Sequence, residues 1–129
     1  MNKNTNQFPH IKRKLKTSEI KPLREQMLIN QDYVCPLCQQ IIDPETTNGP
    51  VLDHCHFTGV IRAVIHRFCN TYLSRIENGT KRNKITDEQL KVILKNAYDY
   101  IKIDTPYLHP TYKSPIDKLL SRNKKKRKK

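Results

Sequence analysis

The chain has 129 residues, of which 25 are lysine or arginine, 12 are aspartate or glutamate, and 36% are hydrophobic. This length supports one compact domain, since a domain usually takes roughly 100 to 200 residues. The apolar runs are only a few residues long, whereas a membrane helix needs ~20 and a signal peptide ~7 to 15. We therefore expect a protein that neither spans a membrane nor is secreted.

Most of the net positive charge lies at the two ends of the chain. Residues 1–16 hold five basic residues and no acidic one, and residues 121–129 hold seven and none, which leaves 13 basic and 12 acidic residues between them. Segments of like charge repel one another, so we predict basic disordered tails that can lie along a polyanion such as nucleic acid. A nonspecific solubilising role for residues 124–129 is the alternative.

The first predicted elements are a short helix, a turn and a loop. Residues 23–30 are rich in good helix formers and follow Pro22, and proline is tolerated in a first helical turn. The motif Cys35-Pro-Leu-Cys38 predicts a knuckle turn. Residues 43–50 contain proline, asparagine, glycine and two threonines, which predict a loop.

A hairpin and a helix are expected next. β-Branched residues on both sides of Thr58-Gly59 predict strands at 51–57 and 60–65. A helix should begin at His66 and end near Asn78-Gly79, where a left-handed cap residue fits.

The clearest predicted helix spans residues 86–101. Thr86 and Gln89 have the spacing of a capping box. The apolar residues follow the spacing of one helical face, which predicts a packing helix or a self-association face. They are Leu90, Ile93, Leu94, Ala97 and Ile101. Prolines at 106, 110 and 115 should break any long element, so we divide the chain into an arm (1–16), a domain (17–104, core 33–73) and a proline-containing segment with a basic tail (105–129).

Two residue pairs have the spacing of a structural zinc site. Zinc prefers thiolate and imidazole ligands in a closed tetrahedron, and pairs separated by two residues supply them from two turns. A domain this small often needs such a staple, and without a secretory signal disulfides are the weaker use of its cysteines. The predicted ligands are Cys35, Cys38, His66 and Cys69. Cys55 as the fourth ligand, or no metal at all, remains an alternative.

The residues between these pairs have the chemistry of metal-assisted phosphodiester hydrolysis. Asp53 and the side-chain oxygen of Asn70 are hard donors that suit Mg²⁺ or Mn²⁺. A neutral His54 could take a proton from an attacking water, and Arg62 could hold a phosphate. Asp53 and His54 would point to opposite faces of a regular strand, so both can serve one phosphate only if the strand twists or ends there. For His54 and His56, a packed or surface histidine is the alternative.

These motifs resemble the recombination endonuclease VII family of phage nucleases, within the wider His-Me finger (HNH, ββα-metal) group. The resemblance covers residues 33–73 and rests on the Cys35–Cys38 knuckle, on Leu-Asp-His-Cys-His-Phe-Thr-Gly at 52–59 with Arg62, and on His-Arg-Phe-Cys-Asn at 66–70. It implies a small α+β domain in which a zinc-clipped hairpin and the following helix form the active centre, flanked by the other helices.

The resemblance also implies roles for single residues. Asp53 and Asn70 would bind the catalytic ion, His54 would be the general base, and His56 would assist at the phosphate. The ion would stabilise the leaving 3′ oxygen. The sequence departs from the family pattern at His66, where a cysteine is usual, and at Ala63, where glycine is common; neither change touches the proposed catalytic atoms.

We accordingly expect a Mg²⁺-dependent DNA endonuclease. It could be a branched-DNA (Holliday-junction) resolvase, which should be a dimer, or a homing-type or nicking enzyme. A noncatalytic zinc-dependent DNA-binding protein and a basic accessory protein that binds RNA or acidic proteins are the alternatives. No membrane partner is expected, and the expected location is the cytoplasm, which would be the host's for a phage protein.

Overall fold

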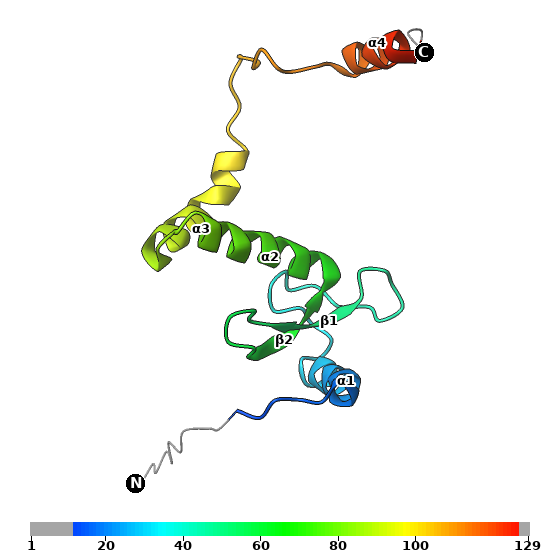
Figure 1. The fold of residues 1–129 in the computed structure, drawn as a ribbon, viewed down its shortest axis with the longest axis vertical. Helices are drawn as coiled ribbons and strands as arrows, with labels where there is room; N and C mark the ends of the chain where they lie inside the picture. Colours follow the sequence, from blue (N-terminus) through cyan, green and yellow to red (C-terminus); the bar gives the residue numbers. More distant parts are fainter. Residues whose placement is uncertain (1–11, 127–129) are drawn as a thin grey trace. The chain divides into compact units, whose positions relative to one another are not determined.

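The structure is a computed structural model, and it describes residues 12–126. The chain divides after Ile85 into two compact units, so the helix at 86–101 lies outside the unit that holds the predicted site. The first unit contains a 3₁₀ turn η1 (Thr17–Glu19), helix α1 (Ile20–Asn30), strands β1 (Pro50–His54) and β2 (Ile61–His66), and helix α2 (Arg67–Arg82). The second contains helices α3 (Asp87–Ile101) and α4 (Pro115–Lys126) (Figure 1). The predicted small α+β fold is confirmed.

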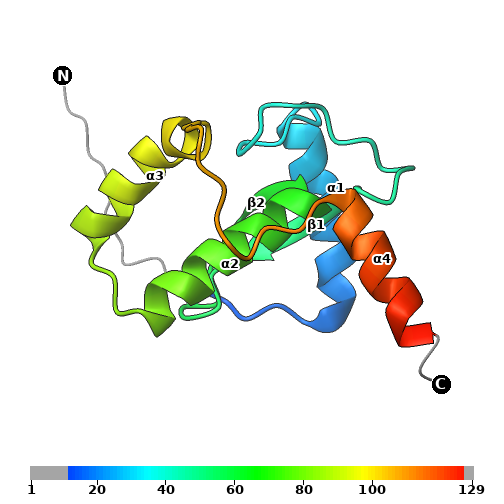
Figure 2. The same ribbon diagram turned by 90° about the horizontal axis from the view of Figure 1, so that it is seen from above.

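Strands β1 and β2 form an antiparallel hairpin that contacts α1 and α2. In Figure 1 the hairpin lies between these two helices, and Figure 2 shows α2 along it. The pairing changes register at the end of β1, because Asp53 pairs with Ala63 whereas His54 pairs with Ile61. Arg62 is therefore the extra residue of a β-bulge, a feature that commonly redirects a side chain. The predicted first strand is three residues too long, since residues 55–57 belong to the connection.

The outer edge of β2 is completed by a side chain from the end of α1. The amide of Gln31 donates to the carbonyl oxygen of Val64 and accepts from the Val64 N–H, both at 2.8 Å. It also donates to the carbonyl oxygen of Val34 at 3.2 Å. These bonds take the place of a third strand, since each edge backbone group needs a partner.

Helix α2 begins with a cap from another segment and continues past its expected end. The N–H of Phe68 donates to the side-chain oxygen of Asn48 at 2.9 Å, so the loop before β1 caps this helix. The expected stop near Gly79 is wrong: α2 continues to Arg82, and the left-handed residue beyond it is Lys84, with a φ of 52°. The carbonyl oxygen of Gly79 instead accepts from the Asn83 side chain at 2.9 Å.

The first unit has a small apolar core into which one predicted metal ligand is built. Its buried apolar residues are Leu28, Cys35, Ile42, Val64 and Ile65. They come from α1, the knuckle, the following loop and β2. The knuckle thus belongs to the core as well as to the predicted metal site.

The capping box predicted for α3 is confirmed, with Thr86 and Gln89 bonded reciprocally. The apolar face of this helix is not buried: Ile93 and Leu94 are 49% and 48% exposed. These exposed fractions describe the second unit by itself, so a packing role for this face and self-association both stay predictions.

Helix α4 corrects the expectation of a disordered C-terminal tail. Pro115 begins this helix, because proline is suited to a first turn, and Ser114 and Asp117 form a cap with an Oγ–Oδ2 distance of 2.7 Å. The prediction of disorder is wrong for residues 121–126. Residues 1–11 and 127–129 of the predicted tails lie outside the described residues. None of the helices described is long and apolar enough to cross a membrane.

Candidate active site and metal centre

The four predicted zinc ligands come together between the knuckle and the start of α2. One ligand atom of each of Cys35, Cys38, His66 and Cys69 lies within 4.8 Å of all the others. In a zinc tetrahedron with Zn–S bonds of ~2.3 Å the ligand atoms are roughly 3.8 Å apart, so these residues fit such an ion. Cys55, the alternative fourth ligand, is not part of this cluster. The cluster is positioned to bind a metal such as zinc.

The ring of His66 is oriented as a metal ligand requires. Its Nε2 lies 3.0 Å from the carbonyl oxygen of Ile41, an atom that can only accept a hydrogen bond, so Nε2 carries the proton. Nδ1 then keeps its lone pair and faces the Cys38 sulfur at 3.2 Å. A partner at the far nitrogen commonly sets the tautomer of a histidine ligand.

The cysteines differ in how readily they ionise. Burial opposes ionisation of Cys35, but hydrogen bonds from the backbone of Cys38, His66 and Leu37 outweigh it and lower the pKa of Cys35 to about 6. Burial, together with hydrogen bonds to Cys38 and Cys35, raises the pKa of Cys69 to about 12. The thiolate of Cys35 is thus favoured at neutral pH while the thiol of Cys69 resists ionisation, and a bound divalent cation would favour the thiolate form of its cysteine ligands.

Asp53 lies near the end of β1, beside the connection to β2, and contacts Arg62. The Asp53 side chain is 7% exposed and accepts two bonds from Arg62, with distances of 2.7 Å from Nε to Oδ2 and 3.1 Å from Nη2 to Oδ1. Such a forked pair is the strongest geometry for arginine and a carboxylate. Arg62 also donates from Nη2 to Oε1 of Glu77 in α2 at 2.9 Å. These hydrogen bonds to Asp53 and Glu77 raise the pKa of Arg62 further above its ordinary value.

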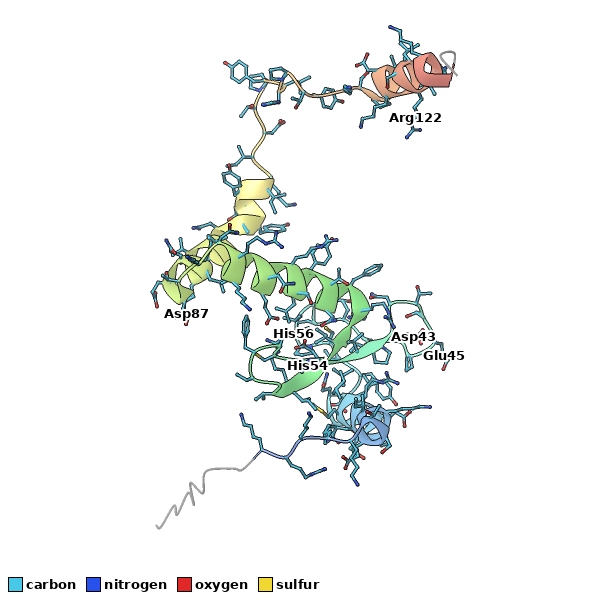
Figure 3. The ribbon with its side chains drawn as sticks, in the orientation of Figure 1. Asp43, Glu45, His54, His56, Asp87 and Arg122 are labelled. Atoms are coloured by element: carbon cyan, nitrogen blue, oxygen red, sulfur yellow. The ribbon has the colours of Figure 1, made fainter. Side chains whose placement is uncertain are left out.

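The two histidines of the motif lie side by side at the end of β1. The rings of His54 and His56 are stacked, with centroids 4.8 Å apart and an angle of 10° between their planes (Figure 3). Both side chains are exposed to solvent. Because β1 ends at His54, with the pairing irregular there, the strict alternation of a strand no longer applies beyond Asp53.

Asn70 lies in the first turn of α2, directly after Cys69. It is half-buried, and α2 contacts both strands of the hairpin. The same turn therefore carries a ligand of the cysteine–histidine cluster and the amide that we predicted for the catalytic ion.

A groove runs past His54 between the hairpin and the segment before α1. One wall is formed by residues 12–15, which include Lys12, Arg13 and Lys14, and the other by residues of β1, β2 and their connection. Arg13 pairs with Glu19 at 3.0 Å. Cations along one wall of a groove attract a polyanion.

The residues of this site fall within a match to a known protein family. The model of the recombination endonuclease VII family matches residues 11–102, most of the chain. The chain belongs to this family. Membership supports a nuclease that acts on DNA. A search of the curated proteins found no match.

Three residues of the site have no local sequence signal that identified them. Glu77, which lies two turns after Asn70 in α2, contacts Arg62; Gln31 bonds to β2, and Asn48 caps α2. Each contact joins positions at least 15 residues apart.

Proposed function

We propose that this protein is a divalent-metal-dependent endonuclease that hydrolyses phosphodiester bonds of DNA. The observation that carries the proposal is the end of β1, where a buried carboxylate, Asp53, is followed directly by the exposed and stacked imidazoles of His54 and His56. A buried acid beside an accessible base suits hydrolysis of a polymer that lies on the surface.

Asp53 and Asn70 would hold Mg²⁺ or Mn²⁺, which is usually bound through one or two protein oxygens with water and phosphate in its other positions. When bound, such an ion supplies charge stabilisation for the leaving 3′ oxygen, and the products would carry a 5′ phosphate and a 3′ hydroxyl. His54 would accept the proton of the attacking water. His56, stacked on His54, would donate to a phosphate oxygen, and Arg62 would contact the scissile phosphate.

The cluster of Cys35, Cys38, His66 and Cys69 would hold a structural zinc ion. Its ligands join the knuckle to the β2–α2 junction. Zinc would thereby keep Asn70, the residue after Cys69, in place beside the hairpin.

We propose branched DNA, such as a four-way junction, as the substrate, with a phage as the source. The name of the family, a recombination endonuclease, supports this choice. Cutting two opposed strands requires two active sites, and the exposed apolar face of α3 would serve a homodimer. The cations of residues 12–14 would contact the backbone of the strand beside His54.

The test is cleavage of a labelled four-way junction and of a linear duplex with the same arms, with Mg²⁺, by zinc-loaded wild type and His54→Ala. His109→Ala is the matched control, because His109 lies outside the site and its side chain bonds only to Thr111 among the described residues. Selective cutting of the junction, lost in His54→Ala and kept in His109→Ala, is expected. Equal cutting of both DNAs would replace the resolvase by a general, homing-type or nicking nuclease. DNA binding without cutting would refute catalysis and leave a zinc-dependent DNA-binding protein.

A further inference from the structure

The side chain of Arg62 is shared between two carboxylates. On one side Asp53 accepts from Nε and Nη2; on the other, Glu77 accepts from Nη2 at 2.9 Å and from Nη1 at 3.4 Å. A third acceptor, the carbonyl oxygen of His54, lies 3.4 Å from Nη2. Guanidinium has five N–H donors, so these contacts leave little donor capacity for a phosphate.

Arg62 in this position competes with the roles proposed for its neighbours. A divalent ion at Asp53 would meet the positive charge of a guanidinium that contacts both carboxylate oxygens. Arg62 can contact a phosphate fully only after it releases one of its two acids. Binding of the ion and release of Arg62 from Asp53 are therefore linked. The ion would bind more tightly when Arg62 is released, and a ligand shifts an equilibrium toward the state that it binds more tightly.

Glu77 determines where a released Arg62 goes. Its side chain is 24% exposed and belongs to α2, whereas Asp53 and Arg62 belong to the hairpin. With Glu77 present, an Arg62 that leaves Asp53 keeps one charged partner. Without it, Asp53 is the only acid among the described contacts of Arg62, so Arg62 holds Asp53 more strongly.

We infer that Glu77 is a positioning residue that sets the divalent-ion affinity of Asp53 by drawing Arg62 away from it. This inference rests on the proposed function, because it takes Asp53 as a ligand of the catalytic ion. Glu77 itself need not touch the ion or the DNA. Its effect on the ion requires Arg62, whereas a carboxylate that attracts cations by charge alone would act whether or not Arg62 is present.

The experiment measures Mn²⁺ binding to the zinc-loaded, DNA-free protein by electron paramagnetic resonance, so it does not depend on cleavage. Four proteins form a double-mutant cycle: wild type, Glu77→Gln, Arg62→Gln and the double variant. Glu77→Gln should weaken Mn²⁺ binding about tenfold, a typical coupling for groups in direct contact. In the Arg62→Gln background, Glu77→Gln should change the dissociation constant for Mn²⁺ less than about twofold. Arg62→Gln alone should bind Mn²⁺ more tightly than wild type.

The control for charge is Glu25→Gln, which removes one negative charge from an exposed position of α1 and should leave Mn²⁺ binding unchanged. Zinc content and melting temperature of each variant report folding. Equal losses from Glu77→Gln in both backgrounds, or no loss in either, would overturn the inference and leave the proposed metal site intact. If wild type shows no Mn²⁺ binding that Asp53→Asn removes, the proposed metal site fails and the inference fails with it.

Discussion

Removal of zinc should unfold the first unit of the protein. The perturbation is chelation of the metal, or Cys35→Ser, which removes a ligand that is completely buried in the core. The other four buried core residues, Leu28, Ile42, Val64 and Ile65, contribute about 6 to 12 kcal/mol in total, as an upper bound. A structural zinc contributes ~10 kcal/mol or more.

These two contributions are of similar size, whereas a domain retains a net stability of only roughly 5 to 15 kcal/mol. Losing the metal therefore removes a free energy comparable to the whole net stability. The unit should lose its cooperative transition, because this cluster ties the knuckle to the junction of β2 and α2 and the apolar core around it is small.

The assay follows released zinc with a colorimetric chelator and the fold by circular dichroism and amide NMR. One zinc per chain should be released together with the dispersed amide signals of the first unit. Cys55→Ser is the matched control, because Cys55 lies outside the cluster, and it should keep one zinc and the wild-type transition. A metal-free protein that melts cooperatively within a few degrees of the loaded one would refute the reasoning.

Other predictions concern single contacts in the zinc-loaded protein. Gln31→Ala leaves the Val64 N–H and carbonyl without their partners and should cost about 2 kcal/mol in denaturant unfolding, whereas an unchanged midpoint would show that water replaces the amide. Asn48→Ala should cost ~1 kcal/mol through loss of the α2 cap, while Asn48→Asp, which keeps the acceptor, should not; equal losses would contradict the cap. Thr86→Ala should increase amide exchange in α3 but leave zinc binding unchanged; protection that stays constant would argue against the capping box. Hydrogen bonds from Ser114 hold the pKa of Asp117 below its ordinary value of 3.8. The α4 cap should therefore be complete above pH 3.8 and be lost as the pH falls through the lowered pKa. The same pH dependence of the α4 NMR shifts in Asp117→Asn would refute this.

Local patterns in the sequence predicted the parts of the molecule whose determinants are close together along the chain. The paired spacings of Cys35–Cys38 and His66–Cys69 predicted a ligand set that the fold brings within reach of one ion. The Thr86 capping box predicted the start of α3, since both partners lie within one turn. The motif at 52–59 led to the family that the comparison confirms.

The same kind of reasoning failed where a local signal had two outcomes. The prolines at 106, 110 and 115 predict a break in any long element but not the helix that begins at Pro115, because a proline preceded by a capping serine also suits a first helical turn. Asn78-Gly79 predicts the end of the helix, but a glycine within a helix costs only ~1 kcal/mol, which the rest of α2 tolerates.

Only the tertiary structure decided how the charges around Asp53 are arranged. The bulge at Arg62, the arrival of Glu77 from α2 and the bonding of Gln31 to the edge of β2 each join segments 9 to 33 residues apart. Such contacts depend on the register of the hairpin and on the angle at which the helices cross it, and neither is encoded in the spacing of neighbouring residues. The sequence thus determined which chemical groups the site contains, and the fold decided which of them face one another.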